Sequence, residues 1–96
     1  MIVMQYTFQI KPGKFDEAVK LAKDGRKNIW PSVICRIYAS NIGPMNTIVI
    51  ENEFEDMAAQ RKHMGQVVAK EEWGPWATSW DKLITGTSTN VVWTLE

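Results

Sequence analysis

The sequence contains little cysteine, little histidine and no net charge. Cys35 is its one cysteine, so an internal disulfide is excluded. His63 is its one histidine, so a zinc site built from several cysteines and histidines is excluded as well. Eleven basic residues balance eleven acidic ones, and a neutral chain lacks the basic footprint of nucleic-acid-binding proteins. We therefore expect no metal and no nucleic-acid partner.

Long apolar runs and phosphate-binding signatures are also missing. No stretch approaches the roughly 20 apolar residues that span a bilayer. The first six residues show neither a basic region nor a cleavage site of small residues. No glycine-rich phosphate loop occurs. We expect a cytoplasmic protein that uses no cofactor and has no membrane partner.

The composition is that of one globular domain, which we place at residues 1–96. Of the 96 residues, 45% are hydrophobic and 23% are charged, values that are ordinary for a soluble domain. A chain of this size buries only about 60–65% of its unfolded surface. Small domains often gain stability from disulfides, metals or oligomerisation, and oligomerisation is the route left open here.

Four segments alternate between two sets of side chains. In the first segment Ile2, Met4 and Tyr6 fall on one face, and Val3 and Gln5 fall on the other. A period of two with β-branched and aromatic residues is typical of strands. We expect strands at residues 2–10, 32–40, 46–55 and 89–95.

Two further segments follow the helical period. Residues 14–30 and residues 56–72 each place apolar side chains along one stripe of a helical wheel. Gly74-Pro75 is expected to break the second helix, because proline disrupts a helix interior. A short helical stretch follows, with Trp76 on its apolar face.

The resulting order, β-α-β-β-α-β, predicts a ferredoxin-like α+β fold, in which a four-stranded antiparallel sheet carries two helices on one face. The strands have apolar residues on both faces, for example Val3 and Met4 in the first strand and Val91 and Val92 in the last. A sheet that is apolar on both sides needs a cover on both sides. A second copy of the chain is the simplest second cover, so we expect a homodimer formed through the open sheet face.

Three pieces of the sequence resemble the NIPSNAP family. Residues 6–14 (YTFQIKPGK) precede a helix that opens at Phe15, residues 43–46 (GPMN) lead into an Ile/Val-rich strand, and Arg61 lies a few residues into the next helix. Their order and spacing cover nearly the whole chain. The resemblance implies a dimeric α+β barrel, in which two ferredoxin-like sheets close on each other. That superfamily includes antibiotic-biosynthesis monooxygenases, haem-degrading enzymes, muconolactone isomerases and stress-response proteins.

Two arginines are candidate ligand-binding residues. Arg26 falls near the centre of the apolar stripe of its helix, where a guanidinium needs a partner. It either lines a pocket or reaches solvent near the helix end. Arg61 matches a family position and lies beside its stripe. It either binds a ligand, or forms an ion pair or a dimer contact.

Three aromatic residues complete the candidate ligand-binding set. Trp76 and Trp80 could form a wall for a flat ligand, or could serve as core or interface anchors. The Tyr6 hydroxyl could contact a ligand or bond to the backbone. We expect His63 to be a surface residue, because it lies away from the apolar stripe, and Cys35 to be an inert apolar residue. No catalytic residue is identified.

Three functions remain open from the sequence. The first is a NIPSNAP-like protein that binds a small apolar or aromatic molecule between helices and sheet. The second is a cofactor-independent monooxygenase or isomerase, whose chemistry needs only positioning and an oxyanion contact. The third is a non-catalytic stress or interaction module. Fold analogy alone cannot choose among them.

Overall fold

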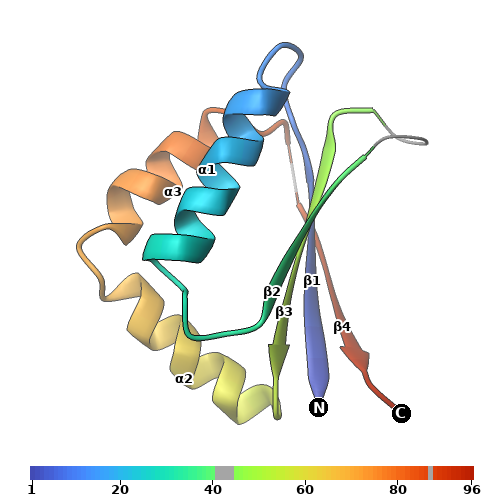
Figure 1. The fold of residues 1–96 in the computed structure, drawn as a ribbon, viewed down its shortest axis with the longest axis vertical. Helices are drawn as coiled ribbons and strands as arrows, with labels where there is room; N and C mark the ends of the chain where they lie inside the picture. Colours follow the sequence, from blue (N-terminus) through green and yellow to red (C-terminus); the bar gives the residue numbers. More distant parts are fainter. Residues whose placement is uncertain (41–44, 87) are drawn as a thin grey trace.

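A computed structural model describes residues 1–40, 45–86 and 88–96. It shows one four-stranded antiparallel sheet with all helices packed on one face (Figure 1). The strand order is β2-β3-β1-β4, so the predicted ferredoxin-like α+β fold is confirmed. The elements in chain order are β1 (Ile2–Gln9), α1 (Phe15–Asn28), β2 (Cys35–Ala39), β3 (Thr47–Phe54), α2 (Met57–Val68), α3 (Trp73–Asp81) and β4 (Thr89–Thr94).

Strict alternation along β3 decides which sheet face meets the helices. Ile48, Ile50, Asn52 and Phe54 are buried, and the residues that alternate with them are half-buried. The register pairs Tyr6 with Ile50 and Phe8 with Ile48, so the even-numbered residues of β1 share that inner face. The face of β1 that carries Ile2, Met4 and Tyr6 therefore meets the helices.

The helix layer rests on the sheet through indole rings packed against Gly25 of α1. The Trp30 and Trp76 rings meet edge to face with centroids 5.1 Å apart, and the Trp76 indole N–H donates to the Leu21 carbonyl at 2.8 Å. A Cβ atom on residue 25 would lie 2.3 Å from a ring carbon of Trp30 and 2.9 Å from Trp76 Nε1. Only glycine permits this approach of the rings to α1.

Backbone hydrogen bonds fasten the end of α3 to the end of β1. The Lys11 N–H donates to the Leu83 carbonyl at 2.8 Å, and the Thr85 N–H donates to the Gln9 carbonyl at 2.8 Å. These bonds fix the position of α3 over the sheet, because both lie within a few residues of its C-terminal end.

The interruption between α2 and α3 falls earlier than expected. The helix α2 ends at Val68, and α3 begins at Trp73, so Gly74-Pro75 lies within the first turn of α3. Proline is tolerated in a first turn, because those N–H groups have no helical acceptor. The Lys70 ammonium donates to the Ile29 carbonyl and ties this corner to the end of α1.

The connection between β2 and β3 is only partly described. The two strands are antiparallel neighbours, as the predicted hairpin requires. Residues 41–44 of that connection, including Gly43-Pro44, lie outside the described residues. Asn46, directly before β3, has a φ of 55°, a left-handed conformation that asparagine tolerates better than most residues.

The face of the sheet opposite the helices carries hydrogen-bonded polar side chains from every strand, which we call the polar row. Trp93 Nε1 of β4 donates to Gln5 Oε1 of β1 at 3.1 Å, and Gln5 Nε2 donates to Glu51 Oε2 of β3 at 3.0 Å. From β2, Arg36 Nε donates to Glu51 Oε1 at 3.2 Å, and the Tyr38 hydroxyl donates to the same oxygen at 3.1 Å. A further ion pair joins Arg36 to Glu53.

Apolar side chains flank the polar row on the same face. Val3, Val49 and Val91 alternate with its members along their strands. Trp93 and Leu95 are 55% and 64% exposed. The open face is therefore mixed: it carries the apolar residues that the sequence predicts on both faces of the sheet, and these surround a charged centre.

Candidate functional site

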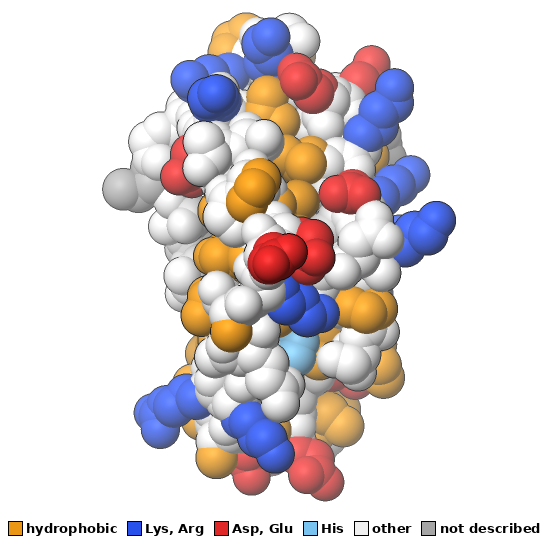
Figure 2. Space-filling model, turned by 90° about the vertical axis from the view of Figure 1, so that its left-hand side faces the viewer, with side chains coloured by type: hydrophobic (Ala, Val, Ile, Leu, Met, Phe, Trp, Pro, Cys, Tyr) orange, Lys and Arg blue, Asp and Glu red, His pale blue; other side chains and the backbone are white. Residues whose placement is uncertain are grey.

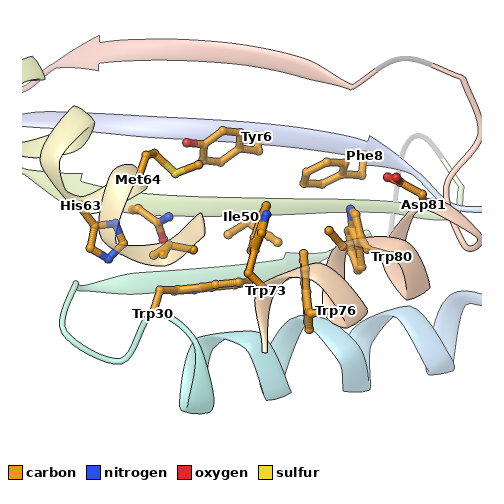
Figure 3. A pocket seen from close by; sticks show the side chains of 13 residues that line it. Tyr6, Phe8, Trp30, Ile50, His63, Met64, Trp73, Trp76, Trp80 and Asp81 are labelled. Atoms are coloured by element: carbon orange, nitrogen blue, oxygen red, sulfur yellow. The ribbon is translucent and has the colours of Figure 1, made fainter. Parts of the chain in front are cut away.

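A cavity of about 210 Å³ lies between the helix layer and the sheet. Side chains from β1, β3, α2 and α3, together with Trp30, point toward it (Figure 3). Its lining consists of Tyr6, Phe8, Trp30, Ile50, Asn52, His63, Met64, Val67, Trp73, Trp76, Ala77, Trp80 and Asp81.

The helix side of the cavity contains three tryptophans of α3. Trp73, Trp76 and Trp80 are spaced three and four residues apart, so they fall on one helix face. Their rings stack in sequence, with centroids 5.6 Å and then 5.3 Å apart. Phe8 of β1 meets the Trp80 ring edge to face at 5.0 Å. The stacked rings therefore form an aromatic wall on the helix side of the cavity, which suits contact with an aromatic ligand.

Three buried polar atoms in the cavity lining have no hydrogen-bond partner within the part of the chain that the structure describes. They are Asn52 Oδ1, His63 Nδ1 and Trp80 Nε1. A buried polar atom without a partner costs about 1–3 kcal/mol. Native proteins have few such atoms, and each one points to a missing partner or to a function.

The structure buries His63, so the predicted surface position is wrong. Its exposed fraction is 9%, and its ring meets the Phe54 ring at a centroid distance of 5.4 Å. The buried residues of α2 are Gln60, His63 and Val67. Two of these three are polar, so the apolar stripe in the sequence, which includes Val67, marked the inner face of the helix only in part.

His63 is held in its neutral form. Burial lowers the pKa of His63 below its ordinary value, and the positive charge of Lys70 lowers it further. A neutral imidazole has one donor and one acceptor nitrogen. His63 can therefore donate or accept a hydrogen bond at Nδ1 without bringing a charge into the cavity.

Tyr6 of β1 contributes a hydroxyl-bearing side chain to the cavity lining. Burial raises the pKa of Tyr6, and a side-chain hydrogen bond with Gln60 opposes that rise. The phenol therefore stays protonated at neutral pH. Its ring stacks beside Phe8 with centroids 6.4 Å apart.

The structure brings together three of the five residues predicted to bind a ligand. Tyr6, Trp76 and Trp80 line the cavity, whereas Arg26 and Arg61 are absent from its lining. Arg26 is half-buried in the last turn of α1, and Arg61 is exposed on α2. Ligand binding by the two arginines thus remains a prediction to which this cavity gives no support.

Sequence reasoning missed the two polar residues deepest in the site. Asn52 occupies an inner-face position of β3 between Ile50 and Phe54. A polar residue at an inward position of an alternating strand is a signal that the pattern did contain. His63 gave no comparable signal, because its neighbours on the inner face of α2 are partly polar.

Cys35 fits its expected apolar role. The Trp30 indole N–H donates to its sulfur at 3.4 Å. Burial raises the pKa of the Cys35 thiol, while the Trp30 hydrogen bond and the charges of Arg26 and Arg36 oppose the rise. A protonated thiol is a poor nucleophile and a poor metal ligand.

The fold and the cavity define a ferredoxin-like α+β protein with an internal site of small-molecule size. The chain belongs to the NIPSNAP family, whose sequence profile matches residues 5–94. The family resemblance of the sequence is thereby confirmed. No curated protein matches the sequence significantly.

Solved structures agree with this assignment. A NIPSNAP domain protein from Burkholderia xenovorans is 19% identical with a TM-score of 0.88, over 100% of this chain and 95% of that one. A NIPSNAP family protein of unknown function from Agrobacterium tumefaciens is 21% identical with a TM-score of 0.82, over 97% and 86% of the two chains. A putative antibiotic biosynthesis monooxygenase from Nitrosomonas europaea is 12% identical with a TM-score of 0.78, over 98% and 97%. At these identities the likeness shows the shared fold.

Two kinds of feature are absent from the residues that the structure describes. No helix that they form has both the length and the apolar character needed to cross a membrane. No three His, Cys, Asp or Glu side chains among them gather as a metal-binding group.

We predict that stability falls as the pH drops from about 7 to about 5.5, because His63 resists protonation only in the folded state. Its folded pKa lies below the unfolded value of 6.5, so the unfolded chain binds a proton that the folded chain excludes. Thermal midpoints measured across this range test the idea. The His63→Gln variant should show a smaller fall, and an equal fall in both proteins would contradict the burial of a neutral imidazole.

Proposed function

We propose that this NIPSNAP family protein binds a small apolar or aromatic molecule in the cavity between the helices and the sheet. The supporting observation is a cavity walled by aromatic rings in which three buried polar atoms lack partners. Ligand sites combine such apolar walls with a few well-placed polar groups. A cavity of about 150 Å³ already accommodates benzene, so about 210 Å³ suits one or two fused rings.

Catalysis is the second candidate function. His63 is neutral and lines the cavity, and a neutral imidazole can accept a proton from a bound substrate. A cofactor-independent monooxygenase or isomerase would need little more than such a group and a positioned substrate. Two structural neighbours are named as antibiotic biosynthesis monooxygenases, which makes this class the first to assay.

The outer surface of the helix layer is a weaker candidate for a ligand site than the cavity. Figure 2 shows charged side chains scattered over this side, with hydrophobic side chains between them. Its surface depression near Leu21 and Leu83 is lined also by charged residues of α1. Scattered exposed apolar residues are normal for a monomeric surface. The aromatic cavity is the better candidate for a ligand.

We further propose that a second copy of the chain covers the open sheet face. The Glu51 and Glu53 side chains are only 17% and 20% exposed on that face, and Trp93 and Leu95 extend the apolar area beside them. A face whose polar groups already satisfy one another can be covered without leaving them unpaired. In that assembly the family fold becomes a dimeric barrel.

Ligand binding is tested by filling the cavity. Ala77 of α3 lines the cavity, whereas Ser79 of the same helix is exposed and outside the lining. We expect saturating 2-naphthol to raise the thermal midpoint of the wild type and of Ser79→Leu, because a ligand bound only to the folded state stabilises it. The Ala77→Leu side chain should abolish that rise.

The proposal fails if neither 2-naphthol nor naphthalene shifts the midpoint of the wild type. It also fails if Ala77→Leu and Ser79→Leu respond equally, because binding would then lie outside the cavity.

Dimer formation is tested by placing a charge on the open face. We expect sedimentation velocity to show a dimer for the wild type and a monomer for Trp93→Asp, because an unpaired carboxylate would be buried in the interface. The matched control is Val68→Asp, at an exposed position of α2, which should remain dimeric. A monomeric wild type at micromolar concentration, or an intact Trp93→Asp dimer, would overturn the assignment.

A further inference from the structure

Two of the unpartnered polar atoms, Asn52 Oδ1 and His63 Nδ1, lie at the same end of the cavity. Asn52 is two residues from Phe54 on the inner face of β3, and the Phe54 ring contacts the His63 imidazole. Figure 3 shows His63 at the opposite end from Trp80 and Asp81. Both polar residues are only 9% exposed. The cavity therefore has one polar end and an aromatic body.

The surrounding side chains do not satisfy these atoms. Ile50, Met64 and Val67 line the same region, and none of them carries a hydrogen-bond donor. The Tyr6 hydroxyl is engaged with Gln60. A ligand that enters the cavity can therefore supply the partner for the polar end.

The two atoms restrict the chemistry of that partner. A carbonyl oxygen such as Asn52 Oδ1 only accepts hydrogen bonds, so the ligand must donate one to it. Neutral His63 can donate or accept at Nδ1, according to its tautomer. A hydroxyl group both donates and accepts, so it can serve an acceptor and an imidazole nitrogen together.

Other polar groups fit this end less well. A carboxylate, ether or ketone has no hydrogen to give to Asn52. An ammonium group at this end would bring a second positive charge near His63, which already feels the charge of Lys70, while Asp81 lies at the other end of the cavity. Burying a charge without a nearby counter-charge is costly.

We propose that the ligand is a planar aromatic or conjugated molecule with a hydroxyl group, a phenol or an enol, bound at the polar end by Asn52 and His63. This assignment rests on the proposed ligand-binding function and names the class of ligand. The ring system lies between Tyr6 and Phe8 of the sheet and the tryptophans of α3. Asn52 and His63 are then the residues that determine specificity.

The test compares three ligands that differ only at one substituent: 2-naphthol, 2-methoxynaphthalene and naphthalene. We expect 2-naphthol to bind the wild type at least about ten-fold more tightly than either of the others, because only its hydroxyl can donate to Asn52. The methyl ether keeps the oxygen but lacks the proton. Dissociation constants from titration of the tryptophan fluorescence measure the difference.

Two variants assign the preference to the polar end. Asn52→Leu replaces the amide with an apolar side chain of similar size, and we expect it to bind 2-naphthol and naphthalene with similar affinity. His63→Phe should reduce the preference in the same direction. If one variant does not fold, the other still tests the assignment, and the comparison of ligands on the wild type requires neither.

The outcomes separate this inference from the proposed function. If the wild type binds all three compounds equally well, the cavity is a ligand site but the hydroxyl assignment is wrong. If a preference for 2-naphthol persists in both variants, Asn52 and His63 do not determine it. If none of the compounds binds, the proposed function itself fails.

Discussion

The contact of Trp30 and Trp76 with Gly25 determines how the helix layer sits on the sheet. The two indoles reach so close to α1 that a Cβ atom at residue 25 would overlap them, and the Trp76 N–H is anchored on the Leu21 carbonyl. Large rigid rings placed between a helix and a sheet hold the two layers apart. Protein cores fill such gaps almost completely, so the open space that remains beside these rings is a feature to be explained.

The contents of that space link the packing to a function. A cavity retained only by imperfect packing would be lined by apolar atoms. Here the inner faces of β3 and α2 place Asn52 and His63 in the lining, and burial keeps the imidazole neutral. Unsatisfied polar atoms lower stability, and their presence beside flat aromatic walls is consistent with a protein that exchanges stability for recognition of a ligand.

The two faces of the sheet differ in what they carry. The inner face forms the floor of the cavity through residues such as Tyr6 and Ile50. The outer face carries the polar row, in which Glu51 accepts hydrogen bonds from three neighbours. Strand register places these groups side by side, because Gln5 and Arg36 both pair with Glu51 across the sheet.

Much of this fold could be predicted from sequence, because alternation and helical periodicity directly report which side chains share a face. The order of strands and helices followed from these periods. The end of α2 could not be predicted from these periods, because Pro75 fits the first turn of a new helix as readily as it ends a preceding one.

The site was harder to predict than the fold. Trp76 and Trp80 were recognised from their spacing, but the burial of His63 depends on the tertiary contact with Phe54, which no local pattern contains. Asn52 was missed, although a polar residue at an inward position of an alternating strand could have identified it. Arg61 drew attention because it matched the family, and the structure places it on the exposed side of α2.

The most direct test of the account is the free energy of unfolding of two alanine variants in helix interiors. Gly65 of α2 has open space where a Cβ would lie, so Gly65→Ala should stabilise the protein by about 0.5–1 kcal/mol through helix propensity. Gly25→Ala gains the same propensity but forces the two indoles away from α1, and overpacking of this kind costs about 1–3 kcal/mol. We therefore predict that Gly25→Ala is the less stable variant and falls below the wild type. A Gly25→Ala protein as stable as Gly65→Ala would show that the indole contact does not hold the helix layer, and would contradict the account.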